Sequence, residues 1–454
     1  MIRGREPSVD RGRARSATRA LRSWRAWTAV GLLAITGHGL AQSCTKYVSE
    51  AGSGREATRE RPARDLGNIV ANLVPGDVVC IAGGRYTGRA DSGADRIEVP
   101  VEIYGGFSPD FSSRDPWGEH VTLFTGVHNA ANFSTDPRLT IDTSAFATRL
   151  MAARGQDTVH AVVVDGLVID HGDRNYYAGD GESRIVRLGS PAHTPTPEAG
   201  GLLIRTGITS TIVVRHVLVV NTAPTQGAIA LFPGAAADVT VENSVAVNNT
   251  GVGFHLSSAI AANDPADYPR YRFAGNVSVF NQKHDPFGTF GGSGVAIESG
   301  TQVEIRDSVI AFNDNYGVDN AKRSAGVVLV DNVIVANARA DYLEFDTKIA
   351  LEDVEDWSDL VADGRGNVRR ELDFALSPAW GALYAARNVI DRNAAEEDVR
   401  AVDTWANDVR AFFGWNLVGT DLSVDSDVWL PRMSLEDAFA VARRFDERYG
   451  VVWP

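Results

Sequence analysis

The residues best suited to chemistry lie close together in the second half of the chain. The segment VEIRDSVIAFNDNYGVDNAKRS, residues 303–324, holds four of them within eight positions: Tyr316, Asp319, Lys322 and Arg323. Lysine, histidine, tyrosine and arginine side chains can accept or donate protons at a catalytic site, and carboxylates can hold a hard cation such as calcium. Lysine is scarce, with four copies in 454 residues. The recurrence of Lys283, Lys322 and Lys348 in successive parts of the chain therefore indicates more than average composition.

A repeated strand pattern must position these residues. A six-residue phrase, apolar inside and ending in Asn or Asp, occurs eight times, with the final residues Asp170, Asn221, Asn248, Asn281, Asn313, Asn337, Asn393 and Asp421. Such a quasi-period is typical of the stacked coils of a β-solenoid. Asn and Asp tolerate the left-handed backbone of a tight corner, and stacked side-chain amides can hydrogen-bond from coil to coil. We therefore expect these corner residues to lie in one line along the solenoid: Asn221, Asn248, Asn281, Asn313 and Asn337.

A second strand follows each corner and usually opens with glycine. Examples are GVGFHL from Gly251, GVAIES from Gly294 and GVDNAK from Gly317. Adjacent coils of a solenoid lie ~4.8 Å apart, so residues at equal offsets from these glycines become neighbours. This alignment predicts one column of side chains made by His255, Glu298 and Ala321, with Lys322 in the next column.

The stacking predicts one exposed groove that gathers the polar residues. Its expected borders are His255, Glu298, Tyr316, Asp319, Lys322 and Arg323, with Lys283 and Arg339 at the rim and His284 and Asn315 near them around the corner. Binding of an acidic ligand by an acidic protein requires such a local concentration of cations. The alternative is that the charges line a solvent-exposed strand edge and form no site.

Three segments near the N-terminus resemble a known superfamily. PGDVVCIAGGRYTG (residues 75–88), IYGGFSPDFSSRDP (residues 103–116) and VVVDGLVID (residues 162–170) are similar to the opening coils of secreted, pectate-lyase-like proteins. The resemblance implies an all-β, right-handed parallel β-helix over residues 42–345. DLGNIVANLVPGD, from Asp65, would be the helix that caps its open end and shields the edge backbone.

The same resemblance suggests a chemistry. Lyases of acidic polysaccharides built on this fold place a Lys and an Arg on neighbouring coils, beside carboxylates that hold calcium. It therefore implies catalytic roles for Lys322, Tyr316, His255 and Arg323, substrate contacts for Lys283, His284, Asn315 and Arg339, and calcium ligands in Glu298 and Asp319. The expected partner is an extracellular polysaccharide, cleaved by a calcium-assisted lyase reaction. A non-catalytic surface, adhesion or glycan-binding solenoid is the alternative, because one fold serves many functions.

Several signature phrases of this superfamily are incomplete here. VIDHGD, around Asp170 and His171, resembles a phrase of pectate lyases, but Asp170 occupies a corner of the repeat and the arginine-rich partner phrase is missing. The Asp triplet and the Gly-His-Gly phrase of the related glycosidases are also missing. YGVDNAKRS resembles the Asp-Pro-His phrase of alginate epimerases without its histidine. The match to the lyases is therefore one of position and not of motif.

The N-terminus and the charge limit the location and the partners. Residues 1–41 combine eight arginines with the apolar run AWTAVGLLAITGHGLA, which predicts a signal peptide and export to the cell surface or medium. No other stretch of the sequence predicts a membrane span. The chain has 44 Lys and Arg against 58 Asp and Glu, a net charge of −14. That excess of acid argues against nucleic acid as a partner. We expect a monomer.

The cysteines and the C-terminal region complete the sequence-based picture. The only two cysteines, Cys44 and Cys80, are expected to form a disulfide after export, with lipidation of Cys44 or metal binding as alternatives. Residues 346–454 have helical spacing, with Ser434 and Asp437 forming a helix cap, and contain six of the nine tryptophans. We expect last coils with helical insertions and a C-terminal cap, in which the tryptophans pack helices or stack on sugars.

Overall fold

A computed structural model describes most of the chain between residue 43 and residue 345, and three short segments beyond it. The described ranges are 43–88, 93–126, 136–146, 161–174, 200–207, 210–223, 226–260, 262, 264–281, 291–322, 324, 326–337, 339–345, 347–349, 363–367 and 433–449. The predicted signal peptide, residues 1–41, lies outside them, as does most of the tryptophan-rich region. Within the described ranges, no helix is both long and apolar enough to cross a membrane.

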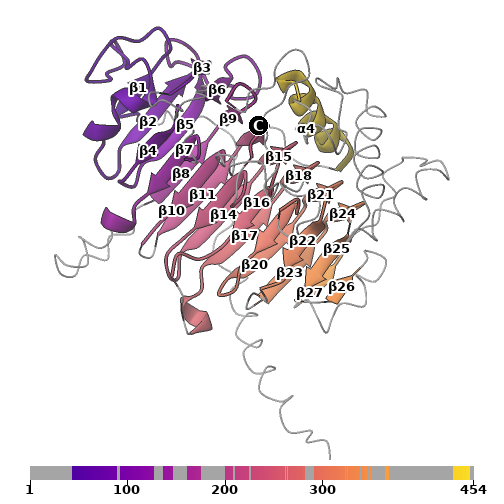
Figure 1. Cartoon of the computed structure of the whole chain (residues 1–454). Helices are drawn as coiled ribbons and strands as arrows, with labels where there is room; N and C mark the ends of the chain where they lie inside the picture. Colours follow the sequence, from indigo (N-terminus) through magenta and orange to yellow (C-terminus); the bar gives the residue numbers. More distant parts are fainter. Residues whose placement is uncertain are drawn as a thin grey trace, which may run out of the picture. The chain divides into compact units, whose positions relative to one another are not determined.

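The strands form three parallel sheets that wind around a common core (Figure 1). Sheet A consists of β1 (Lys46–Val48), β2 (Val78–Ala82), β5 (Glu102–Phe107), β8 (Ala161–Asp165), β11 (Thr211–Arg215), β14 (Asp238–Glu242), β17 (Arg270–Ala274), β20 (Gln302–Arg306), β23 (Gly326–Val330) and β27 (Asp363–Arg365). Sheet B consists of β3 (Gly84–Tyr86), β6 (Thr122–Thr125), β9 (Leu167–Asp170), β12 (Leu218–Val220), β15 (Val245–Val247), β18 (Val277–Val279), β21 (Val309–Ala311) and β24 (Val333–Val335). Sheet C consists of β4 (Asp95–Ile97), β7 (Leu139–Asp142), β10 (Leu202–Arg205), β13 (Ile229–Phe232), β16 (Phe254–Leu256), β19 (Val295–Ile297), β22 (Tyr316–Asn320), β25 (Ala340–Glu344) and β26 (Thr347–Ile349).

Each coil contributes one strand to each sheet in the order A, B, C. Every strand pair in the described part of the chain is parallel except β25 with β26, which pair antiparallel at the end of sheet C. This topology is that of a right-handed parallel β-helix, and it confirms the predicted fold. Inward side chains stack in rows, such as Ile229, Phe254, Val295 and Val318, each no more than 2% exposed. Burial of each such side chain contributes about 1.5–3 kcal/mol, so the stack itself is the core.

The corner between sheets B and C carries buried asparagines, but in two columns instead of one. Asn221 and Asn248 have left-handed backbones (φ 57° and 56°), and the Asn248 amide donates to the Asn221 amide oxygen at 2.9 Å. One residue further along, a second column contains Asn249, Asn281, Asn313 and Asn337, linked by amide hydrogen bonds of 2.9–3.1 Å. The predicted single line is therefore wrong. The left-handed position in these later coils is filled by Phe280, Phe312 and Ala336.

This offset has a physical consequence at the corner. Phe280 and Phe312 adopt a backbone that bulky side chains rarely take, and their rings stack 5.3 Å apart. The following asparagines turn inward, where each satisfies the polar backbone of the coil it meets. The Asn313 amide, for example, also donates to the carbonyl of Ser278. The predicted polar ladder is thus present: Asn281, Asn313 and Asn337 are final residues of the repeated phrase, and only Asn249 lies one position after one, Asn248.

A second polar ladder lies at the corner between sheets A and B. Ser244 and Ser308 donate their backbone N–H groups to the amide oxygens of Asn276 and Asn332, at 2.9 and 3.0 Å. The N–H of Asn276 donates in turn to the Ser308 hydroxyl. The sequence signal was present, because the repeated phrases begin with Asn or Ser as well as ending with Asn.

The N-terminal end is closed by two short 3₁₀ helices instead of the single predicted helix. They are η2 (Leu66–Asn68) and η3 (Val70–Asn72). The side chain of Asp65 accepts a hydrogen bond from the backbone N–H of Asn68 and caps η2. Leu66 and Ile69 are 1% exposed and belong to the main core, so the segment does cover the first coils.

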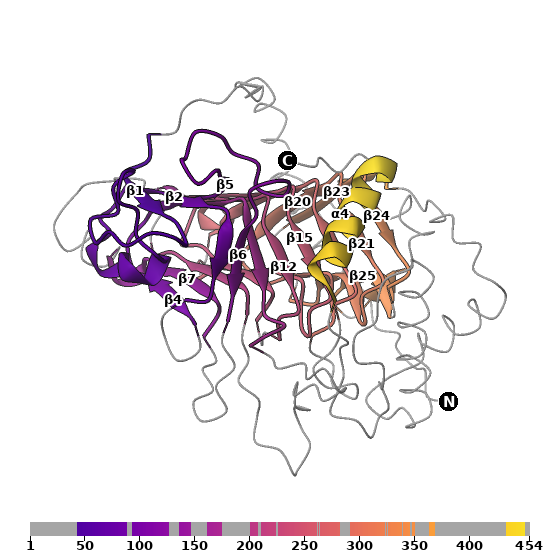
Figure 2. The same cartoon turned by 90° about the horizontal axis from the view of Figure 1, so that it is seen from above.

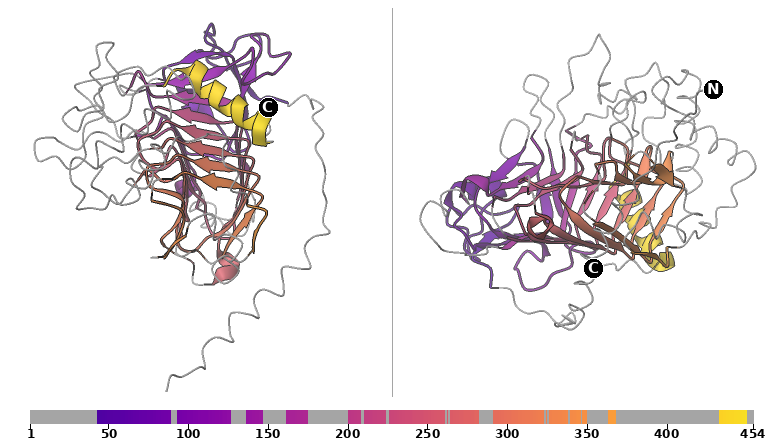
Figure 3. Two further views of the ribbon diagram at one scale, coloured as in Figure 1. Left: turned by 90° about the vertical axis from the view of Figure 1, so that its right-hand side faces the viewer. Right: turned by 90° about the horizontal axis from the view of Figure 1, so that it is seen from below.

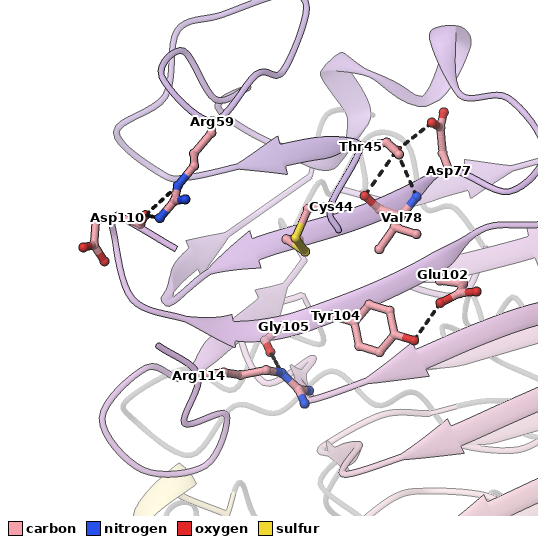
Figure 4. The surroundings of a disulfide bond; sticks show 11 residues. Cys44, Thr45, Arg59, Asp77, Val78, Glu102, Tyr104, Gly105, Asp110 and Arg114 are labelled. Atoms are coloured by element: carbon pink, nitrogen blue, oxygen red, sulfur yellow. Dashed lines mark hydrogen bonds between the residues drawn. A yellow bond between two sulfur atoms is a disulfide. The ribbon is translucent and has the colours of Figure 1, made fainter. Parts of the chain in front are cut away.

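The predicted disulfide is present in this first part of the fold. Cys44 and Cys80 are bonded, with their Cα atoms 5.8 Å apart (Figure 4). Beside the bond, the Thr45 hydroxyl donates to Asp77 at 2.7 Å and accepts from the backbone N–H of Val78 at 3.0 Å. The bond and these contacts fasten the start of the described chain to β2.

The described C-terminal helix lies on the side of the β-helix. Helix α4 (Leu435–Tyr449) is capped as predicted, since Asp437 donates its N–H to the Ser434 hydroxyl at 3.0 Å. Its apolar residues pack on the outer, valine-rich face of sheet B (Figures 2 and 3). The Asn221 amide also bonds both the N–H and the carbonyl of Met433. Whether the rest of residues 346–454 caps the last coils stays a prediction.

We predict that Asn281→Ala destabilises the fold by about 1–3 kcal/mol, because it leaves buried polar partners in Asn249 and Asn313 unsatisfied. Equilibrium unfolding in urea measures this change. The control is Asn72→Ala, at an exposed position of η3 where no side-chain bond to a described residue is lost. Equal stability of the two variants would contradict a stabilising ladder.

We also predict that the double variant Cys44→Ser/Cys80→Ser loses about 3–4 kcal/mol of unfolding free energy. The bond spans 36 residues, and the chain-entropy model gives this cost for a loop of that length. Urea unfolding of the oxidised protein, the reduced protein and the double variant provides the measurement. The reduced protein should have the same unfolding free energy as the double variant. A loss below about 1 kcal/mol would contradict the predicted loop-closure entropy of the bond.

Candidate functional site

The outer face of sheet C brings together residues from β16, β19 and β22, but in a different register from the one predicted. His255 lies beside Ala296, and Ala296 lies beside Asp319. In the predicted column of His255, Glu298 and Ala321, His255 is therefore misplaced by two residues, whereas Glu298 and Ala321 keep the predicted alignment. The partner of Gly294 is Gly253 and not Gly251, because Gly251 (φ 128°) still belongs to the corner.

Gly253 is required at its place by close packing. A Cβ there would lie 2.7 Å from the Asn281 amide nitrogen and 2.7 Å from the carbonyl oxygen of Gly294. Gly294 meets Asn313 in the same way one coil later. The glycines thus let sheet C approach the asparagine ladder, and this contact sets the register of the outward residues that follow.

Glu298 lies between two cationic or ionisable side chains. Its Oε1 atom is 3.3 Å from Nε2 of His255, and its Oε2 atom is 3.5 Å from Nζ of Lys322. The His255 side chain is 9% exposed, that of Glu298 27% and that of Lys322 64%. The three residues therefore form a graded site that runs from a buried imidazole to an exposed ammonium.

His255 is held tightly but is not fully satisfied. The ring of Phe232 meets it edge-to-face at 5.3 Å. Its second nitrogen, Nδ1, is buried and has no hydrogen-bond partner among the described residues. A buried polar atom without a partner costs about 1–3 kcal/mol, and such costs concentrate at functional sites.

The environments of Glu298 and Asp319 shift their pKa values in opposite directions. The hydrogen bond from His255 lowers the pKa of Glu298 below its ordinary 4.5, and the charges of His255 and Lys322 act in the same direction against the effect of burial. Burial raises the pKa of Asp319 above 3.8, although the N–H of Ala321 and the hydroxyl of Ser293 donate to its carboxylate. Two neighbouring carboxyl groups with separated pKa values suit an anion and a proton donor.

This arrangement does not fit the calcium site that was expected. Both oxygens of Glu298 face positively charged or ionisable groups, and Asp319 is buried where its charged form is disfavoured. Across the ranges that the structure describes, no three His, Cys, Asp or Glu side chains converge as a metal-binding group. Calcium prefers six or more oxygen ligands, so Glu298 and Asp319 alone do not make such a site.

The remaining predicted site residues differ in burial and contacts, and some lie outside the described residues. Tyr316 is 7% exposed and its hydroxyl makes no hydrogen bond to a described residue. Asn315 is fully buried and donates to the carbonyl of Gly291 at 3.1 Å, which gives it a structural contact. Arg339 is half-buried, and its N–H donates to the carbonyl of Asn315. Lys283, His284 and Arg323 lie outside the described residues.

Two members of the site were missed in the sequence. Phe232 ends the phrase GAIALF, at an outward position two residues after Ala230, and a large aromatic there was a usable signal. Ser293, whose hydroxyl lies 3.3 Å from Asp319, precedes the strand and carries no repeat signal. Only the corner geometry places it.

Comparison with known proteins adds little to this picture. No protein-family model matches the chain, and no curated protein matches it. Among solved structures, pectate lyase Pel9A has a TM-score of 0.31 and 10% identity, over 68% of this chain and 58% of that one. XylC in complex with xylose has a TM-score of 0.23 and 9% identity, over 64% of this chain and 69% of that one. Neither likeness carries an inference about the activity of this protein.

We predict opposite effects of two substitutions on stability at neutral pH. Glu298→Gln should lower the melting temperature, because a carboxyl with a lowered pKa stabilises the fold above about pH 4.5 and loses that contribution as the pH falls. Asp319→Asn should leave the melting temperature unchanged or raise it. A carboxyl with a raised pKa stabilises the fold at low pH and loses that contribution as the pH rises.

Thermal unfolding between pH 3 and pH 8 measures both effects. The exposed Glu98→Gln is the matched control, since its side chain is 64% exposed and, among the described residues, forms an ion pair with Arg96 alone. Both differences from wild type should shrink toward pH 3. Parallel curves for the two variants at every pH would contradict the opposite shifts.

Proposed function

We propose that the outer face of sheet C binds an acidic polysaccharide and that the site around Glu298 cleaves it by β-elimination. The observation that supports this proposal is the convergence of Lys322, Glu298 and His255 from three successive coils. An extended polymer can lie across such a face, because the strands of sheet C stack in parallel from coil to coil. The expected substrate class is a glycan that contains uronate residues.

The proposed chemistry uses the side chains according to their environments. Lys322 is an exposed ammonium and pairs with the carboxylate at C6 of the sugar, which makes the proton at C5 more acidic. The Glu298 carboxylate, which is 27% exposed and held in place by Nε2 of His255, accepts the C5 proton. The electron pair forms the C4–C5 double bond, the C4–O bond breaks, and the carboxyl of Asp319 gives its proton to the leaving oxygen. No step requires a metal ion.

A non-catalytic glycan-binding solenoid is the second candidate. It is favoured by the exposure of Lys322 and by the burial of His255, whose side chain is only 9% exposed. Under this alternative, the same charges hold the polymer and no bond breaks.

Export is proposed with either function, since such polysaccharides are extracellular. The disulfide between Cys44 and Cys80 supports it, because disulfides persist in oxidising compartments. The predicted leader, residues 1–41, would direct the chain there.

We predict that the protein, incubated with a panel of acidic polysaccharides, generates absorbance near 235 nm from unsaturated uronates. Lys322→Ala should lower turnover by roughly 100-fold or more, as expected for loss of an electrostatic stabiliser, with the melting temperature nearly unchanged. The matched control is Lys46→Ala, which removes a lysine from β1 at the far end of the β-helix.

The same assay with added calcium and with EGTA tests the calcium prediction, and equal rates would remove calcium from the mechanism. Tight binding without new absorbance on any substrate would contradict the lyase hypothesis and support the non-catalytic, glycan-binding solenoid. Neither binding nor cleavage across the panel would overturn the proposed function.

A further inference from the structure

Arg205 extends the polar face of sheet C away from the site. It ends β10, directly beside Phe232 of β13, and its guanidinium lies over the Phe232 ring at 5.3 Å from the centroid. The same ring meets His255 edge-on at 5.3 Å. One aromatic side chain therefore holds both the imidazole of the site and an arginine on the neighbouring coil.

The charge of Arg205 is not used within the described structure. Three other outward arginines pair with carboxylates: Arg96 with Asp142, Arg215 with Asp165, and Arg270 with Asp238. For Arg205, no carboxylate of a described residue lies within 4 Å. The closest candidate by register is Asp142, whose two oxygens are engaged by Arg96 and Ser144.

The position of Arg205 relative to Glu298 follows from the strand register. Both are outward residues of the same column, which runs through Arg205 of β10, Phe232 of β13, Ser257 directly after β16 and Glu298 directly after β19. Three strand spacings separate them, or ~14 Å. A group that contacts both places must therefore belong to an extended ligand and not to a single sugar.

We propose that Arg205, held flat by Phe232, is a distal subsite that recognises an anionic group, carboxylate or sulfate, of a polysaccharide lying across the strands of sheet C. The planar guanidinium presents parallel N–H donors that match such anions, and the ring reduces the freedom lost on binding. Arg205 is a half-buried cation with no carboxylate partner among the described residues, and in a chain of net charge −14 it attracts an anion locally. This inference rests on the proposed function and defines its substrate as anionic and longer than a disaccharide.

Binding measurements on full-length protein test the subsite. Isothermal titration with uronate oligosaccharides from disaccharide to octasaccharide, with sulfated neutral-backbone and uncharged chains of the same lengths, covers the ligand chemistry. Arg205→Ala should weaken binding of the longest anionic ligand by about tenfold or more, and leave the disaccharide unchanged. Phe232→Leu should give a smaller loss of the same kind, because the arginine remains without its support.

Two controls make the result specific. Arg205→Lys keeps the charge and loses the planar donors, so its affinity for the long ligand should lie between those of wild type and Arg205→Ala. Arg272→Ala removes an exposed outward arginine of sheet A and should change nothing. The sulfated and uronate series identify which anion the subsite accepts.

The outcomes separate this inference from the proposed function. If wild type binds long anionic chains and Arg205→Ala binds them equally well, the subsite is wrong and the proposed function stands. Equal losses for short and long ligands would also overturn it, because Arg205 would then not act at a distance. Equal binding of uncharged chains would overturn anion recognition, and no binding by wild type would overturn both.

Discussion

The hydrogen-bond ladder between successive coils is the constraint on which the rest of this structure depends. Parallel strands lie at a fixed spacing. Once their register is set, it determines which outward side chains become neighbours. His255 and Asp319 are 64 residues apart in the sequence, yet they lie in one column because β16, β19 and β22 pair strand by strand. A site on such a scaffold is therefore specified by register more than by local sequence.

The fold could be predicted from the sequence because the repeat signal is redundant. Eight phrases pointed to the same architecture, so errors in single phrases did no harm. The predicted register of sheet C depends instead on which glycine is taken as the first residue of each strand. Gly251 and Gly253 look alike in the sequence, and only the contact of Gly253 with Asn281 and the carbonyl of Gly294 distinguishes them. Glu298 and Lys322 meet as predicted, because Gly294 and Gly317 are partners in the observed register. His255 and Glu298 still meet as well, because their long side chains bridge the offset of two residues along the strand.

The corners show why a residue pattern can be right for one reason and wrong in detail. Asn was expected because it tolerates a left-handed backbone, and Asn221 and Asn248 confirm this. In later coils, Phe280 and Phe312 take the strained position while Asn281 and Asn313 satisfy buried backbone groups. Hydrogen-bond demand inside the corner outweighs backbone preference there, since an unsatisfied buried group costs more than one left-handed residue.

The electrostatics of the site follow from the same geometry. Stacking places Glu298 against His255 and Lys322, which favours its charge, while Asp319 one coil away is buried and its charge is disfavoured. Two carboxyl groups whose pKa values are shifted in opposite directions thus arise from adjacent coils of one repeat. Since the ladder fixes their relative position, a ligand that lies across the coils would meet an anion, a proton donor and a cation in a set order.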